Sequence, residues 1–169
     1  MMDRRTLLTT GAAIGALALA SRVGRAQTMT AAEKTIDFKH LGDAEWKQRL
    51  TAAQFDVLRE HGTERAGTSD LNHEKRKGTF ACAGCDLPLF SSDTKFESGT
   101  GWPSFYQPLS SAVETTTDRS FFMTRTEVHC SRCAGHLGHV FNDGPKPTGL
   151  RYCMNGVALK FIPSGVSAS

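Results

Sequence analysis

The sequence lacks an even complement of cysteines: it contains five, and none of them occurs before Cys82. An odd number excludes a framework in which every thiol is paired within the chain. Four of the five form two C-x-x-C pairs, Cys82 with Cys85 and Cys130 with Cys133. Two pairs at this spacing predict a tetrahedral zinc site with four thiolate ligands. Cys153 is then left without a partner, which makes it a candidate nucleophile.

The chain also has no excess of basic residues beyond residue 26. The formal charge is +3, and residues 1–26, with four arginines and one aspartate, account for all of it. From residue 27 onward, 16 basic residues are balanced by 16 acidic ones. This balance gives no global electrostatic reason to expect a nucleic-acid partner.

The chain has no hydrophobic run long enough for a confident membrane span. Its charge-free stretch, residues 6–21, follows Arg4 and Arg5 and is rich in alanine, leucine and glycine. This pattern is typical of a twin-arginine export signal. We expect residues 1–26 to be removed after Ala26, or alternatively after Ala20, which predicts a periplasmic or secreted protein without a membrane partner. The alternative is an uncleaved N-terminal anchor.

No alternation of strands with long helices is present, which argues against a parallel sheet. After a linker at residues 27–42, residues 43–50 and 51–61 predict two short helices, the second capped by Thr51 and Gln54. Gly62 is the predicted left-handed C-cap. Apolar and aromatic runs predict strands at 120–128, 139–141, 150–153 and 157–162. We expect one mainly antiparallel β domain at residues 43–163, followed by a tail at 164–169.

The two C-x-x-C pairs have an alternative interpretation. Exported proteins meet an oxidising compartment, where paired cysteines often form disulfides. A C-x-x-C disulfide closes a very small loop, however, and constrains little of the unfolded chain. One structural Zn²⁺ is therefore the favoured cofactor, and loading before export would be compatible with a pathway that carries folded proteins.

Three further segments carry candidate chemistry. Trp102 follows a glycine-rich turn, His136 and His139 lie three residues apart, and Cys153 is followed by Asn155. Taken singly, the tryptophan is compatible with a core position, the histidines with structural or ligating roles, and the cysteine with a buried thiol. Together they offer a thiol, two imidazoles, a carboxamide and an aromatic wall, which favours thiolate chemistry on a substrate with an apolar group beside a polar oxygen.

These motifs, with the segments 98–105, 135–141 and 151–155, closely resemble those of peptide methionine-R-sulfoxide reductases of the B type. The similarity covers about residues 43–162. It implies a small β-sandwich of two antiparallel sheets with short N-terminal helices and with the zinc away from the catalytic cysteine. It also implies an enzyme that reduces the R epimer of methionine sulfoxide in oxidised proteins or peptides.

The resemblance assigns a role to each matching residue. Cys153 would attack the sulfoxide sulfur and become a sulfenic acid, while His139 and His136 would handle the proton. Asn155 would orient the histidines or the oxygen. The substrate methyl group would lie against Trp102 and Phe141.

One position departs from the resemblance. Many members of this family carry a resolving cysteine immediately before the Gly-Trp pair, whereas this chain has Thr100. If the four paired cysteines hold zinc, Cys153 has no intramolecular partner. We therefore expect an external reductant: a thioredoxin-like protein, a glutaredoxin-like protein or a small thiol. The alternative function is a non-catalytic zinc-stabilised binding module, and a monomer is the default expectation in either case.

Overall fold

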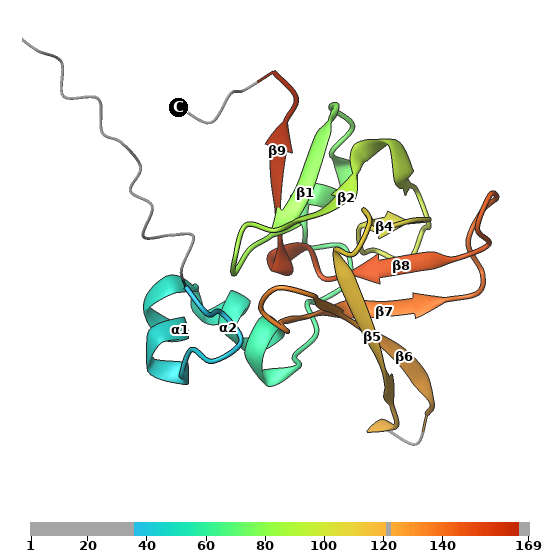
Figure 1. Ribbon diagram of the computed structural model, residues 1–169. Helices are drawn as coiled ribbons and strands as arrows, with labels where there is room; N and C mark the ends of the chain where they lie inside the picture. Colours follow the sequence, from blue (N-terminus) through green and yellow to red (C-terminus); the bar gives the residue numbers. More distant parts are fainter. Residues whose placement is uncertain (1–35, 121–122, 166–169) are drawn as a thin grey trace, which may run out of the picture. The chain divides into compact units, whose positions relative to one another are not determined.

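The computed structural model describes residues 36–120 and 123–165 (Figure 1). The predicted leader, most of the predicted linker and the end of the predicted tail lie outside these ranges. Within them, no helix is both long enough and apolar enough to span a bilayer. Part of the predicted linker packs against the domain, because Phe38 is buried and its ring centroid lies 6.1 Å from that of Trp46.

Two short helices begin the described domain, as the sequence predicts. They are α1 (Asp43–Arg49) and α2 (Ala52–Glu60). The capping box of α2 is formed: the Thr51 hydroxyl accepts from the Gln54 N–H at 3.2 Å, and the Gln54 side chain accepts from the Thr51 N–H at 3.0 Å. The three large apolar residues of α2 are buried in the core: Phe55, Val57 and Leu58.

The predicted C-cap of α2 is wrong by one residue. His61, not Gly62, adopts the left-handed conformation, with φ 57° and ψ 29°. The N–H groups of both residues donate to the carbonyl oxygen of Asp56. Gly62 instead lies close to Asp56: a Cβ there would lie 2.1 Å from the carboxylate, which would have to move, and 3.1 Å from the carbonyl oxygen. The glycine therefore permits a close approach, and the histidine takes the strained conformation.

The rest of the domain is mainly β, in two antiparallel sheets, as predicted. The three-stranded sheet has the order β2 (Pro88–Ser91), β1 (Gly78–Cys82), β9 (Leu159–Pro163), and these strands lie side by side in Figure 1. The six-stranded sheet has the order β3 (Lys95–Phe96), β4 (Ser104–Phe105), β8 (Arg151–Met154), β7 (His136–Phe141), β6 (Arg125–Cys130), β5 (Val113–Asp118). Short 3-10 turns connect several strands: η2 (Asp70–His73), η3 (Ser92–Thr94) and η5 (Gly156–Ala158).

The predicted strand at 120–128 starts too early. The strand begins at Arg125, and the edge strand β5 precedes it. β5 has the sequence Val-Glu-Thr-Thr-Thr-Asp, and its four central residues are exposed. It therefore lacks the apolar alternation that marks a half-buried strand, and pairing with β6 along its whole length holds it in place.

The two sheets share one hydrophobic core. The ring of Phe105 on β4 stacks on Phe90 of β2 at 4.4 Å between centroids and meets Phe80 of β1 edge-on at 4.9 Å. All three side chains are fully buried. Aromatic burial of this kind contributes a few kcal/mol per ring. These contacts fix the six-stranded sheet, which carries Cys153, against the three-stranded one.

Candidate active site and four-cysteine centre

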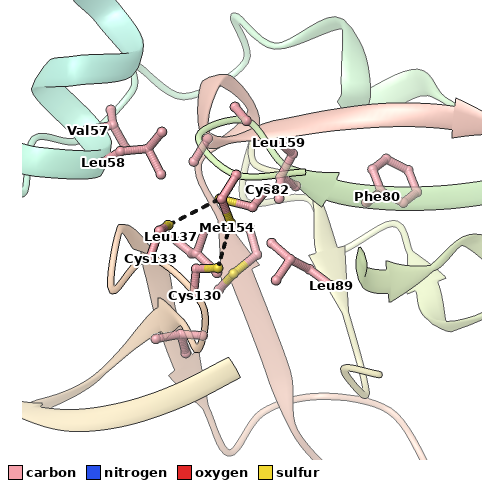
Figure 2. Packing of buried hydrophobic residues seen from close by; sticks show 14 of the residues in the cluster. Val57, Leu58, Phe80, Cys82, Leu89, Cys130, Cys133, Leu137, Met154 and Leu159 are labelled. Carbon is pink, nitrogen blue, oxygen red and sulfur yellow. Dashed lines mark hydrogen bonds between the residues drawn. The ribbon is translucent and has the colours of Figure 1, made fainter. Parts of the chain in front are cut away.

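The four paired cysteines meet where the two sheets come together. Cys82 and Cys85 lie at the turn after β1, and Cys130 and Cys133 lie at the turn after β6. Their Sγ atoms all lie within 4.8 Å of one another. The Cys82–Cys133 distance is 3.7 Å and the Cys85–Cys130 distance is 3.5 Å, and Figure 2 shows this sulfur cluster beside Leu137 and Met154.

The sulfur spacing fits a metal ion. A disulfide would require about 2.05 Å between sulfurs. Tetrahedral zinc with bonds of about 2.3 Å separates its sulfur ligands by about 3.8 Å. Each turn also repeats one backbone arrangement, in which a residue of positive φ, Asp86 or Ala134, donates its N–H to the carbonyl of the first cysteine. The four buried thiols are therefore positioned to hold one metal ion.

Cys153 lies in the middle of the six-stranded sheet. On β8 it is paired with Ser104 of β4 on one side and with His139 of β7 on the other. Residues directly opposite in an antiparallel pair project from the same face. The register therefore brings the Cys153 thiol and the His139 imidazole together.

A pocket of about 210 Å³ opens at this face of the sheet. Five of the six predicted catalytic and substrate-binding residues line it: Trp102, His139, Phe141, Cys153 and Asn155. None of the four cysteines of the metal centre is among its described lining residues. Three further residues complete the lining, and the sequence motifs did not assign them to the site: Thr63, Arg125 and Gly138.

The sixth predicted residue, His136, is buried behind His139. The ring centroids of His136 and His139 are 5.4 Å apart, and His136 is only 3% exposed. Its Nδ1 lies 2.7 Å from Oε1 of Glu127, while its Nε2 has no hydrogen-bond partner among the described residues. Burial lowers the pKa of His136, against the opposing effect of Glu127. The neutral imidazole is thereby favoured.

His139 is held by a carboxylate. Its Nε2 lies 2.9 Å from Oδ2 of Asp118, and the same oxygen accepts from Arg125 at 2.6 Å. Hydrogen bonds from Ser120, followed by that from His139, lower the pKa of Asp118. Asp118 is therefore ionised at neutral pH and orients the His139 ring.

Trp102 forms a wall of the pocket and is only partly buried. Its Nε1–H donates to the Glu64 carbonyl oxygen at 2.9 Å. The preceding Gly101 has φ +91°, and a Cβ there would lie 2.9 Å from the Gly67 nitrogen. The glycine thus allows the tight turn that presents the indole, as the sequence suggests.

The ring of Phe141 contacts an arginine that is itself paired with a carboxylate. The Arg151 guanidinium lies 4.4 Å from the Phe141 ring centroid and forms two 2.8 Å bonds to the carboxylate of Asp143. The hydrogen bond to Asp143 raises the pKa of Arg151, and the charge of Cys153 adds to that effect. The arginine therefore supports the aromatic wall and contributes positive charge near the thiol.

The side-chain amide of Asn155 forms its hydrogen bonds to backbone groups. Its Oδ1 accepts from the Glu64 N–H at 2.9 Å and its Nδ2 donates to the Leu137 carbonyl oxygen at 3.1 Å. Neither histidine is among its hydrogen-bond partners. The carboxylate of Glu64 also accepts from the Gly156 N–H at 2.6 Å. Glu64, which the sequence did not single out, thus ties the segment after Cys153 to the Trp102 wall.

Thr100 contacts the thiol directly. Its Oγ1 lies 3.8 Å from Sγ of Cys153 and 2.8 Å from Oγ of Ser98, which in turn lies 2.8 Å from Oγ of Ser104. A chain of three hydroxyls therefore ends at Cys153.

A spacing of two residues along a strand could have revealed some of the site residues that the motifs did not identify. Arg125 and Glu127 lie two residues apart on β6, so their side chains share one face of the sheet. Two charged residues at that spacing in a strand indicate a polar face. Asp118 and Glu64 carried no such signal.

Residues 50–163 match the SelR domain family. A Leptospira interrogans protein named "Peptide methionine sulfoxide reductase MsrB" is 58% identical over 120 residues, which are 70% of this chain and 92% of that protein. A Bradyrhizobium diazoefficiens protein of the same name is 51% identical over 139 residues, 82% of this chain and 97% of that protein. The Arabidopsis thaliana protein "Peptide methionine sulfoxide reductase B1, chloroplastic" is 55% identical over 130 residues, 76% of this chain and 64% of that protein.

Proposed function

The chain belongs to the SelR domain family and is a peptide methionine sulfoxide reductase of the MsrB type, and from this premise we propose that Cys153 reduces the R epimer of peptide-bound methionine sulfoxide. The observation that carries the proposal is the pocket in which Cys153 lies opposite His139 and beside Trp102 and Phe141.

The chemistry balances with one thiol and one sulfoxide. The Cys153 thiolate attacks the sulfoxide sulfur, the sulfoxide oxygen takes up a proton, and methionine leaves as its thioether. The oxygen ends on Cys153 as a sulfenic acid. The substrate sulfur is reduced by two electrons and Cys153 is oxidised by two.

His139 is the proposed proton donor to the oxygen, because a sulfoxide oxygen leaves poorly until it is protonated. Asp118 orients this imidazole, and Arg125 pairs with the carboxylate of Asp118. His136, next to it, supports the same step through its ring contact. Asn155 acts as a positioning residue through Glu64 and Leu137.

The substrate methyl group is proposed to lie against Trp102 and Phe141. Both rings line the pocket of Cys153, and both are held by neighbours, Trp102 by Glu64 and Phe141 by Arg151. A rigid aromatic wall on one side and a proton donor on the other would distinguish the two hands of the sulfoxide. This arrangement supports preference for one epimer.

The sulfenic acid is proposed to be reduced from outside the chain. Thr100 lies where a resolving thiol would be needed, and the four other cysteines form the metal centre. Two equivalents of thiol would regenerate Cys153, with release of water and a disulfide of the reductant. A thioredoxin-like or glutaredoxin-like protein, or a small thiol, supplies these electrons.

The metal of the four-cysteine centre is proposed to be Zn²⁺. The four buried thiols and their 3.5 Å and 3.7 Å sulfur spacings support this assignment. When bound, zinc supplies a structural cross-link, and Cys82, Cys85, Cys130 and Cys133 hold it.

Residues 1–26 are proposed to direct twin-arginine export, so that the mature enzyme works in the periplasm or outside the cell. The mass of the protein recovered from those fractions distinguishes cleavage after Ala26 from cleavage after Ala20. Recovery only with the membrane, at full mass, would favour the uncleaved anchor.

The reductase assignment is tested by Cys153→Ser. Wild-type protein with racemic peptidyl methionine sulfoxide and dithiothreitol is expected to consume the R form alone, as measured by chiral analysis. The variant removes the nucleophile and is expected to consume neither form. Turnover by Cys153→Ser would end the nucleophile assignment, and no loss of either form with wild-type protein would favour the binding-module alternative.

A further inference from the structure

A second group of metal-ligating side chains lies beside the catalytic pocket. It consists of His61, Glu127 and His136, whose ligand atoms lie within 4.8 Å of one another. The three residues come from separate elements: the end of α2, β6 and β7. They line one cavity of about 490 Å³, which also reaches His139. The mechanism above uses neither His61 nor Glu127 directly.

Two imidazoles converge on one carboxylate oxygen. Nδ1 of His61 lies 3.1 Å from Oε1 of Glu127, and Nδ1 of His136 lies 2.7 Å from the same atom. The two rings are 5.3 Å apart between centroids. A tetrahedral ion with bonds of about 2.1 Å separates its nitrogen and oxygen ligands by about 3.4 Å. From the 3.1 Å and 2.7 Å distances, the nitrogens of His61 and His136 would therefore need to move away from the carboxylate oxygen by about 0.3 Å and about 0.7 Å.

The surroundings favour a cation. Three carboxylates line the cavity against two guanidinium groups: Glu60, Asp118 and Glu127 against Arg119 and Arg125. His136 is 3% exposed, and its contact with Glu127 is its one side-chain hydrogen bond among the described residues. His61, in contrast, is 65% exposed and reaches solvent. One ligand is thus preorganised by burial and another is accessible to an entering ion.

We propose that His61, Glu127 and His136 bind a divalent transition metal ion of the class that takes imidazole and carboxylate ligands, and that its binding inhibits the reductase. Water from the cavity completes the coordination. Binding at Nδ1 requires that each of these nitrogens carry no proton, which leaves the one proton of each neutral imidazole on Nε2. It also fixes the His136 ring, which contacts His139. The inhibitory part rests on the proposed function, whereas the binding site does not.

His61 provides the most selective variant. Asparagine tolerates the left-handed conformation found at this position, so His61→Asn keeps the helix end while removing the ligand. His73, another exposed histidine, lies on η2 and serves as the matched control in His73→Asn.

The binding arm uses zinc-loaded full-length protein carrying Cys153→Ser, so that the catalytic thiol does not compete for metal. Ni²⁺ is titrated and followed by calorimetry. One equivalent is expected to bind, with affinity weakened about tenfold or more by added His61→Asn and unchanged by added His73→Asn. Equal affinity with and without His61, or no binding up to about 1 mM Ni²⁺, overturns the site.

The inhibition arm uses protein with Cys153 intact in a single turnover without added thiol, which avoids chelation by the reductant. Ni²⁺ is expected to slow methionine release relative to each protein's own metal-free rate, and His61→Asn is expected to reduce that slowing. An undiminished effect in His61→Asn overturns the inhibitory role. Absence of turnover without metal contradicts the proposed function instead, and the binding arm still decides the site.

Discussion

At the residue scale, the contact between Thr100 and Cys153 determines how the proposed cycle closes. The hydroxyl lies 3.8 Å from the thiol sulfur, at the end of a chain that runs through Ser98 and Ser104. A hydroxyl can hydrogen-bond to the sulfur but cannot form a disulfide with it. In the proposed cycle, the oxidised cysteine would therefore require an external thiol.

Thr100→Cys tests this geometry. A thiol in place of the hydroxyl would lie close enough to condense with the Cys153 sulfenic acid after a small adjustment, because a disulfide needs sulfurs about 2.05 Å apart. We expect an intramolecular disulfide after one turnover, detected by peptide mapping under non-reducing conditions. Thr100→Val, which matches threonine in size, serves as the control without a thiol. Failure of Thr100→Cys to form this disulfide would count against the placement of Thr100 beside Cys153.

The close contacts around Gly156 explain why a residue without a side chain stands at this position. A Cβ at this position would lie 1.9 Å from Oγ of Ser69, and its N–H donates to Glu64. The glycine therefore lets the segment after Cys153 pack against the loop that carries Glu64. Nothing in the sequence alone indicated this contact.

At the element scale, the local elements were predictable and the pairings were not. Thr51 and Gln54 form a capping box within four residues, so a short stretch of sequence is enough to predict the start of α2. β5 has no apolar alternation and exists through its pairing with β6. Its end carries Asp118, whose contact with His139 spans 21 residues, and Glu64 reaches Asn155 across 91. The motifs therefore sufficed to propose Cys153 and His139 as site residues, whereas the residues that contact them became apparent only in the fold.

Asp118→Asn tests the support that the end of β5 gives to His139. The pKa of Asp118 is lowered from 3.8, first by Ser120 and then by His139, while Arg125 pairs with the same carboxylate. A depressed carboxyl pKa contributes stability that is fully present above the unfolded value and is lost only as the pH falls through the lower folded value. We therefore expect the stability difference between wild type and variant, measured by urea unfolding, not to shrink as the pH falls from 8 to 5.

The same variant should slow catalysis. Without the carboxylate, the His139 ring loses the partner that orients it, and we expect kcat to fall by between about tenfold and a hundredfold. Steady-state kinetics with the R-sulfoxide measure this loss. A stability difference that already shrinks between pH 7 and pH 5, or an unchanged kcat, would contradict the assigned role.

At the scale of the whole described domain, the four-cysteine centre joins the two sheets. Cys82 and Cys85 belong to the turn of the three-stranded sheet, and Cys130 and Cys133 to a turn of the six-stranded one. The phenylalanine contacts between the sheets act in parallel with this link. Cys153 lines the pocket, and none of the four cysteines of this centre is among the pocket's described lining residues.

Removal of the metal is expected to unfold the domain. Structural zinc contributes an apparent free energy of about 10 kcal/mol or more, which is comparable to the whole stability of a typical domain, about 5–15 kcal/mol. A strong chelator, or Cys130→Ser, should abolish the cooperative thermal transition seen by circular dichroism. Cys153→Ser should retain it, because Cys153 lies outside the centre. A chelated protein that melts like the untreated one would refute a structural role for the metal.

In the proposed cycle, one cysteine performs the chemistry and has no disulfide partner in the chain. The intact mass of the wild-type protein, after incubation with a stoichiometric amount of R-sulfoxide and no reductant, tests both statements. We expect one methionine to be released per enzyme and the protein to gain one oxygen, located on Cys153 by dimedone labelling. A loss of two hydrogens, with Cys153 in an intramolecular disulfide, would contradict this expectation.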